Sequence, residues 1–162
     1  MLDKVTHVLL CVAAVLVLGF QVYPHFHKVV QPRTKIQTVV GQTLHNTGLK
    51  LTTDRNLVLL ISSSCMYCLA SVPFYQSLSE RKQPADLNVQ VIFREGKRVS
   101  PTFLKDSKIN LPVTENIDFT ALKVQATPTI LLLDRNGKVI NSWVGLLSPE
   151  NKIKFIHEVY GE

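Results

Sequence analysis

Two cysteines, Cys65 and Cys68, stand three positions apart where a strand-like run passes into a helix-like run. The apolar residues 57–61 come before the pair, and residues 69–80 after it have helical character. A cysteine at such a junction lies at the helix N-terminus, where unpaired N–H groups and the helix dipole favour an anion. We therefore expect a lowered pKa for Cys65, which makes it the better nucleophile. Cys68 follows one turn later, within disulfide reach.

A Cys-x-x-Cys pair has other uses, and the surrounding residues weigh against two of them. A zinc site needs about four ligands, and the third cysteine, Cys11, lies far away in an apolar segment. Attachment of a c-type haem needs histidine directly after the second cysteine, where this chain has Leu69. An inert structural pair and half of a shared metal site remain open, but we expect redox chemistry with no cofactor and no resident metal.

The N-terminal segment is apolar over residues 5–23, which is about the length that spans a bilayer as a helix, and Pro24 ends it. We expect residues 1–24 to be a membrane anchor in contact with lipid through residues 5–23. A cleaved signal peptide is the main alternative, although no clear cleavage site is present, and a buried core helix is another. Cys11 lies inside this run and is interpreted as a small apolar residue.

Residues 25–38 mix proline with charged and polar residues and are expected to be a linker, and residues 39–162 a single domain. The formal net charge is +6. Its largest local group is Arg94, Lys97 and Arg98, which suggests a solvated loop, so no nucleic-acid partner is expected.

The domain alternates strand and helix patterns. Buried strands are expected at residues 57–61, 87–93 and 129–133, and a hairpin strand at 138–144. Helices are expected at residues 69–80 with a kink at Pro73, at 101–107, at 118–124 and from Pro149 onward, the last with a buried stripe of Ile153, Ile156 and Tyr160. Residues 39–44 and 48–51 suggest a preceding hairpin. This order predicts an α/β fold with a central mixed sheet flanked by helices.

Three features together resemble the thioredoxin superfamily, and more narrowly its membrane-anchored TlpA/ResA type. They are the strand–Cys65-Met-Tyr-Cys68–helix unit with Pro73, the segment 124–129 around Thr127-Pro128, and the hairpin-like segment 131–140. The resemblance covers roughly residues 39–160. It implies a thioredoxin-like fold preceded by a transmembrane helix, and a thiol–disulfide oxidoreductase whose partners are protein thiols and disulfides.

The resemblance also implies a cis peptide bond between Thr127 and Pro128, with the proline against the disulfide. The backbone of Thr127 would then pair with an extended substrate strand. It further implies an extracytoplasmic domain, periplasmic or on the outer face. The positive charges after the span, Lys28, Arg33 and Lys35, indicate the opposite orientation.

The chain departs from the family pattern at three places. Ser64 replaces the tryptophan usual before the first cysteine. Leu59 stands where many thioredoxins have a buried acid, and Ser71 where the TlpA/ResA type often has glutamate. The usual proton relay for the second cysteine is therefore missing, which leaves water, another acid or slow exchange.

The leading functional hypothesis is thiol–disulfide exchange, with Cys65 as nucleophile and Cys68 as the resolving residue, in a direction that the sequence leaves open. The alternative is a non-catalytic docking or metal-carrier module tethered to the membrane, with the sulfurs and a histidine holding a soft metal ion. A peroxidase is a distant third, because Val58 replaces the proline that peroxiredoxins would have.

Overall fold

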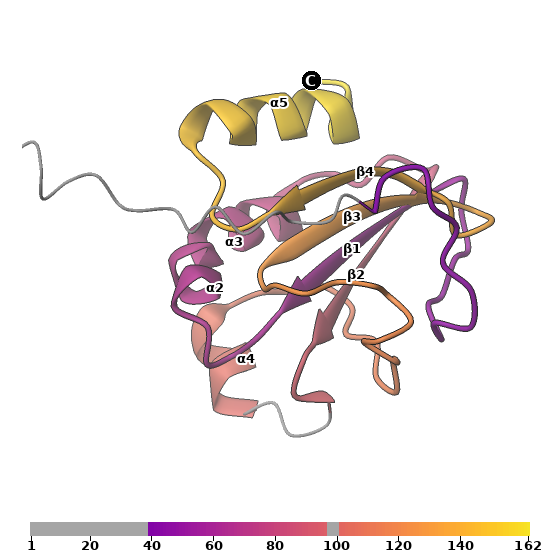
Figure 1. Ribbon diagram of the computed structural model, residues 1–162. Coiled ribbons are helices and arrows are strands. Elements are labelled where there is room, and N and C mark those ends of the chain that lie inside the picture. Colours follow the sequence, from indigo (N-terminus) through magenta and orange to yellow (C-terminus); the bar gives the residue numbers. More distant parts are fainter. Residues whose placement is uncertain (1–38, 97–100) are drawn as a thin grey trace, which may run out of the picture. The chain divides into compact units, whose positions relative to one another are not determined.

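A four-stranded mixed sheet forms the centre of the domain (Figure 1). The structure is a computed structural model that describes residues 39–96 and 101–162. The strands are β1 (Arg55–Ile61), β2 (Leu87–Phe93), β3 (Thr129–Asp134) and β4 (Val139–Val144), in the order β2-β1-β3-β4. The sequence prediction of these four strands is confirmed, including the mixed character of the sheet.

The register of the strands brings four chain segments to one end of the sheet. β1 and β2 are parallel and both finish there, with Ile61 opposite Phe93. β3 runs antiparallel to both of its neighbours and begins at the same end, where Thr129 lies opposite Leu60 of β1 and Val144 of β4. The residues just after β1, β2 and β4, and those just before β3, therefore meet at this end.

The helix after the cysteines is divided in two, as α2 (Met66–Ala70) and α3 (Val72–Glu80). We expected one helix with a kink at Pro73, and this expectation is wrong. Ser71 closes α2, donating its N–H to the carbonyls of Tyr67 and Cys68, and also starts α3. Pro73 then occupies the first turn of α3, where its missing N–H costs no helical hydrogen bond.

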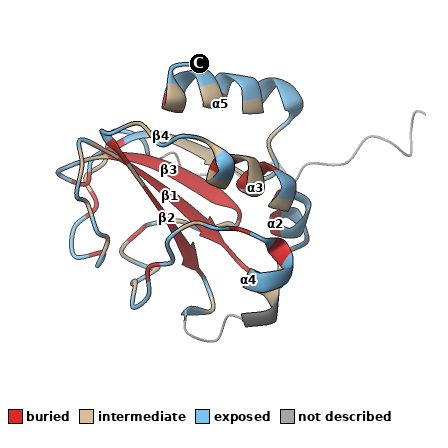
Figure 2. Cartoon of the chain, turned by 180° about the vertical axis from the view of Figure 1, so that it is seen from behind, coloured by how far each residue is buried: buried red, intermediate tan, exposed pale blue. Residues whose placement is uncertain are grey.

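Strand side chains alternate between two apolar clusters, one on each face of the sheet. Leu57 and Leu59 of β1 face the cluster formed with α3 and α5 (Pro149–Tyr160), whereas Val58 and Leu60 face the opposite one. Figure 2 shows β1, β2 and β3 as the buried layer, β4 as mostly intermediate, and α5 with an exposed outer surface. This burial on both faces explains the continuous apolar run in β1.

The face of the sheet away from α3 and α5 packs against irregular segments. The expected hairpin of residues 39–44 and 48–51 is wrong, because residues 41–44 pair with the start of β4 instead, including a bridge between Thr43 and Lys138. The expected helix at residues 118–124 is also wrong. Asp118 accepts hydrogen bonds from the N–H and hydroxyl of Thr120, and the chain continues as turns.

Two further helices match the sequence prediction in position. α4 is Pro101–Ser107, and in α5 Ser148 is the N-cap, accepting the N–H of Asn151 at 3.3 Å. The predicted stripe of α5 is partly wrong, because Ile153 is 71% exposed while Phe155 and Val159 are buried. Phe155 lies edge-on to Phe74 and to Trp143, with ring centroids 5.3 and 4.8 Å away, so aromatic packing selects the face of α5 that is buried.

The predictions for the N-terminal part concern residues outside the described ones. These are the anchor at residues 1–24 with its bilayer contact at 5–23, and the linker at 25–38. Within residues 39–96 and 101–162, no helix is both long and apolar enough to cross a membrane.

Candidate active site

Cys65 occupies the position expected from the sequence, at the junction between the end of β1 and the start of α2. It is the N-cap of α2, with extended backbone, and its Sγ accepts the N–H of Cys68 at 3.4 Å. The side chain is half-buried, and both cysteines are reduced thiols. The junction therefore presents one sulfur to solvent and satisfies an N–H of the first helical turn with it.

The surroundings of Cys65 lower the pKa of its thiol, as we expected. Partial burial raises the pKa, but hydrogen bonds to the sulfur outweigh this effect. They involve the backbone N–H and the side chain of Cys68, with smaller contributions from Thr127 and the N–H of Tyr67. Hydrogen bonds to the charged form of a group favour that form, so the thiolate is stabilised at this N-cap.

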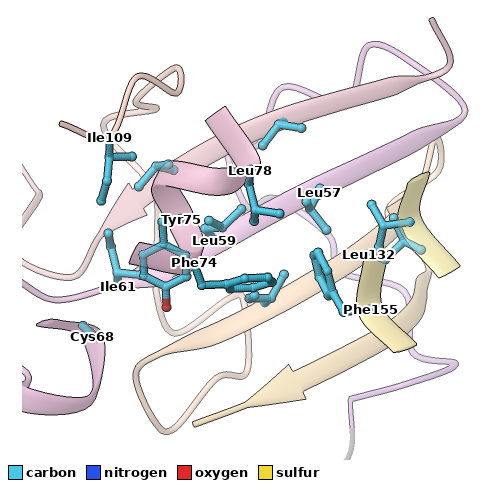
Figure 3. Close-up of a cluster of buried hydrophobic side chains, with 14 of the residues drawn as sticks. Leu57, Leu59, Ile61, Cys68, Phe74, Tyr75, Leu78, Ile109, Leu132 and Phe155 are labelled. Carbon is cyan, nitrogen blue, oxygen red and sulfur yellow. The ribbon is translucent and has the colours of Figure 1, made fainter. Parts of the chain in front are cut away.

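Cys68 has the opposite character. It is 1% exposed and belongs to the apolar cluster on the α3 side. Figure 3 places it at one end of this cluster, on the side of Ile61 and Tyr75. Burial raises the pKa of Cys68 to about 12, opposed mainly by the N–H of Ser62, which donates to its Sγ at 3.4 Å. The pair thus combines an accessible, acidic thiol with a buried, protonated one.

The loop before β3 lies against Cys65, as the resemblance implied. The Thr127–Pro128 peptide bond is cis, and the thiol of Cys65 donates to the carbonyl oxygen of Thr127 at 3.2 Å. Pro128 is buried, and its carbonyl accepts the N–H of Gly145 at 2.8 Å, which ties the loop to the residue after β4. The sheet register therefore brings the proline loop to the sulfur.

The surface of α2 beside Cys65 is apolar and exposed. The exposed fractions are 71% for Met66, 37% for Tyr67 and 48% for Leu69, and Ser64 is exposed as well. Such side chains next to a reactive sulfur suit contact with another polypeptide. The absence of the usual tryptophan leaves serine, not an aromatic ring, at the position before the nucleophile.

The two positions where the resemblance implies an acid are both buried and uncharged here. Leu59 is fully buried in the core, and Ser71, 3% exposed, donates its hydroxyl to the carbonyl of Tyr67 at 2.8 Å. An acid does reach the site from another strand. Glu95, just after β2, accepts from the hydroxyl of Ser62 at 2.6 Å and from the N–H of Ser63 at 3.0 Å.

Sequence reasoning missed Glu95 because its neighbours Arg94, Lys97 and Arg98 suggested a solvated basic loop. One signal was available. If the apolar strands at 57–61 and 87–93 are parallel neighbours, the residues that follow them lie at the same end of the sheet. An acid directly after the second strand is then a candidate neighbour of the cysteine turn.

Histidines that could join the sulfurs in a metal site are not gathered near them. His45 and His157 are exposed, and His25 and His27 lie outside the described residues. Among residues 39–96 and 101–162, no three His, Cys, Asp or Glu side chains are grouped closely enough to hold a metal ion.

The fold has counterparts among solved structures. A thiol-disulfide isomerase from Corynebacterium glutamicum is 20% identical, with a TM-score of 0.53 over 76% of this chain and 93% of its own. StoA from Bacillus subtilis is 17% identical, with a TM-score of 0.51 over 61% and 80%. A secreted Mycobacterium tuberculosis disulfide oxidoreductase, homologous to E. coli DsbE, is 12% identical, with a TM-score of 0.54 over 69% and 84%.

At these identities the likeness establishes the fold alone. A comparison with curated protein sequences finds no match. The family model described as a thioredoxin-like domain matches residues 49–160, which include β1, the cysteine pair, the proline loop and α5. The chain therefore belongs to the thioredoxin-like domain family.

Proposed function

We propose that this protein is a thiol–disulfide oxidoreductase that exchanges disulfides with partner proteins through Cys65 and Cys68. The observation that carries the proposal is the division of labour between the two sulfurs. Cys65 is accessible and hydrogen-bonded in a way that lowers its pKa, whereas Cys68 is buried with a pKa of about 12. Attack on a partner therefore falls to Cys65.

In the first step, the Cys65 thiolate attacks one sulfur of a partner disulfide. The partner's S–S bond breaks, a bond forms between the Cys65 sulfur and that partner sulfur, and the other partner sulfur leaves as a thiolate. The carbonyl of Thr127 and the exposed side chains of Met66 and Tyr67 lie beside the reacting sulfur. An extended partner segment placed there can pair with the loop backbone.

In the second step, Cys68 loses its proton to solvent and attacks the sulfur of Cys65. The mixed disulfide breaks, the partner sulfur leaves as a thiolate, and the Cys65–Cys68 disulfide forms. The partner gains two electrons and the pair loses two. The same steps in reverse oxidise a partner dithiol, and the reduction potential of the pair sets the direction.

The test is turnover of a protein disulfide by the full-length chain. We expect reduction of insulin disulfides with dithiothreitol as electron source to be faster with the protein than without it, and Cys65→Ser to remove the acceleration. The reverse direction is measured as oxidation of reduced, unfolded ribonuclease by the oxidised protein. Equal rates for the protein and Cys65→Ser in both assays would refute the proposal.

We further propose that residues 5–23 anchor the protein in a membrane, with the domain on the extracytoplasmic side as in the TlpA/ResA type. The apolar run and Pro24 support the anchor. The full-length chain should stay with membranes after an alkaline wash, and a chain lacking residues 1–24 should not. Protease added to sealed cells or spheroplasts should digest the domain. Release by the wash would contradict the membrane anchor, and protection from protease would contradict the extracytoplasmic location of the domain.

A further inference from the structure

Glu95 contacts the turn that carries the cysteines through a single carboxylate oxygen. Its Oε1 accepts the Ser62 hydroxyl at 2.6 Å, the Ser63 N–H at 3.0 Å and the Ser63 hydroxyl at 3.3 Å. The other oxygen, Oε2, is buried without a hydrogen-bond partner among the described residues. One carboxylate oxygen thus accepts three hydrogen bonds, two of them from the hydroxyls of consecutive serines. This arrangement indicates a specific structural contact rather than a solvated acid.

The contact fixes one peptide unit from both sides. The N–H of Ser63 donates to Glu95, while the carbonyl of Ser62, on the opposite side of the same peptide, accepts the N–H of Cys65 at 3.3 Å. The peptide therefore cannot rotate without breaking one bond or the other. Ser62 itself is buried, and its hydroxyl makes the shortest of the three hydrogen bonds to Glu95.

The residue held in this way is the one that contacts the resolving sulfur. The N–H of Ser62 donates to the Sγ of Cys68 at 3.4 Å, and it is the strongest influence that opposes the effect of burial on this thiol. A hydrogen bond to a charged acceptor is stronger than one to a neutral acceptor, so this N–H favours the Cys68 thiolate over the thiol.

We propose that Glu95 is a positioning residue for the resolving step. Its carboxylate holds Ser62 through the hydroxyl and through the Ser62–Ser63 peptide. The N–H of Ser62, on the preceding peptide, then stays directed at Cys68 and stabilises the thiolate that attacks Cys65. The inference rests on the proposed roles of the two cysteines. Glu95 acts through its hydrogen bonds rather than by accepting the proton, which goes to solvent.

The experiment measures the reactions of the two sulfurs separately, as two phases of a single absorbance trace. The reduced full-length protein, carrying Cys11→Ala so that only the pair reacts, is mixed with an aromatic disulfide whose thiol product is coloured. Attack by Cys65 releases the first coloured thiol at a rate that depends on reagent concentration. Resolution by Cys68 releases the second at a rate independent of that concentration, because the step is intramolecular.

Glu95→Ala should slow the second phase about tenfold, as for a pKa of Cys68 raised by about one unit, and change the first by less than about twofold. Glu95→Gln keeps an oxygen acceptor and should restore the second phase to within about threefold. The matched control, Glu80→Ala, removes an exposed acid with the same change in net charge and should leave both phases unchanged.

An unchanged second phase in Glu95→Ala would overturn the inference. Equal slowing in Glu95→Ala and Glu95→Gln would overturn it as well, because the charge and not the acceptor would then be needed. Should Glu95→Ala fail to fold, Ser62→Ala removes the shortest contact to the acid together with the contacts of the same hydroxyl to Ser64. It should slow the second phase about threefold, and no slowing would count against the inference. The trace reports on the sulfurs alone, so inactivity in both the insulin and the ribonuclease assays would refute the proposed function without deciding the role of Glu95.

Discussion

The Sγ atom of Cys65 lies 3.2 Å from the carbonyl oxygen of Thr127, a residue 62 positions further along the chain. The contact follows from the pairing of β1 with β3, which places Thr129 opposite Leu60 and so brings the end of one strand to the start of the other. The register of the sheet thus holds together the proposed nucleophile and the loop backbone that we propose to bind an extended partner.

The first prediction concerns the pH dependence of Cys65. Its rate of alkylation by iodoacetamide, followed by mass spectrometry, should reach half its maximum at a pH below the ordinary thiol value of 9.0, because hydrogen bonds stabilise the thiolate. The same residue in the urea-unfolded chain should titrate near the ordinary value. A folded midpoint at or above the unfolded one would contradict the lowered pKa.

These two thiols have opposite effects on the stability of the reduced protein. The lowered pKa of Cys65 contributes stability above the unfolded pKa, and this contribution is lost as pH falls through the folded value. The raised pKa of Cys68 contributes stability below the unfolded value of 9.0, and this contribution is lost as pH rises toward about 12. The two pH ranges meet near 9.0, so the stability of the reduced protein rises with pH below that value because of Cys65 and falls above it because of Cys68.

A second prediction separates the roles of the cysteines. Cys68→Ser should still attack a disulfide but should accumulate as a mixed disulfide, because no thiol remains to resolve it. The adduct is measured by intact mass under non-reducing conditions. Cys65→Ser should form little adduct, because Cys68 is buried and its pKa is about 12. Rapid modification of Cys68 in that variant would argue against the assignment.

A third prediction tests the packing of α5. Phe155→Ala should lower the free energy of unfolding by about 3–5 kcal/mol, because the ring is fully buried and contacts Phe74 and Trp143. Ile153→Ala, on the exposed side of the same helix, should change it by no more than about 0.5 kcal/mol. Denaturant unfolding measures both, and similar values for the two variants would mean that α5 packs on another face.

A fourth prediction concerns the turn between β3 and β4. Gly137 has φ +80°, and an added Cβ would lie 2.8 Å from the carbonyl oxygen of Leu44, whose N–H bonds to the carbonyl of Gly137. Gly161 has φ +73° and open space around it. Gly161→Ala should therefore cost about 1–2 kcal/mol from the backbone alone. Gly137→Ala should cost clearly more by the same measurement, and equal costs would exclude the clash.

The sequence determined the elements whose signals are local. The apolar runs predicted β1, β2 and β3, because residues buried on both faces of a sheet must be apolar throughout, and β4 was predicted as a hairpin strand. The cysteine spacing and its position between a strand and a helix predicted the N-cap location of Cys65, since capping depends on only a few neighbouring residues. The resemblance added the cis peptide bond at Pro128, which the structure confirms.

Tertiary structure decided what depends on contacts between distant segments. It selected Phe155 over Ile153 as the buried side of α5, and paired residues 41–44 with β4 instead of residues 48–51. It also brought Glu95 to the serines before Cys65, although the chain around Glu95 suggests a solvated loop. Parallel pairing of β1 and β2 joins these residues, and strand pairing is set by the whole core rather than by either strand's own sequence.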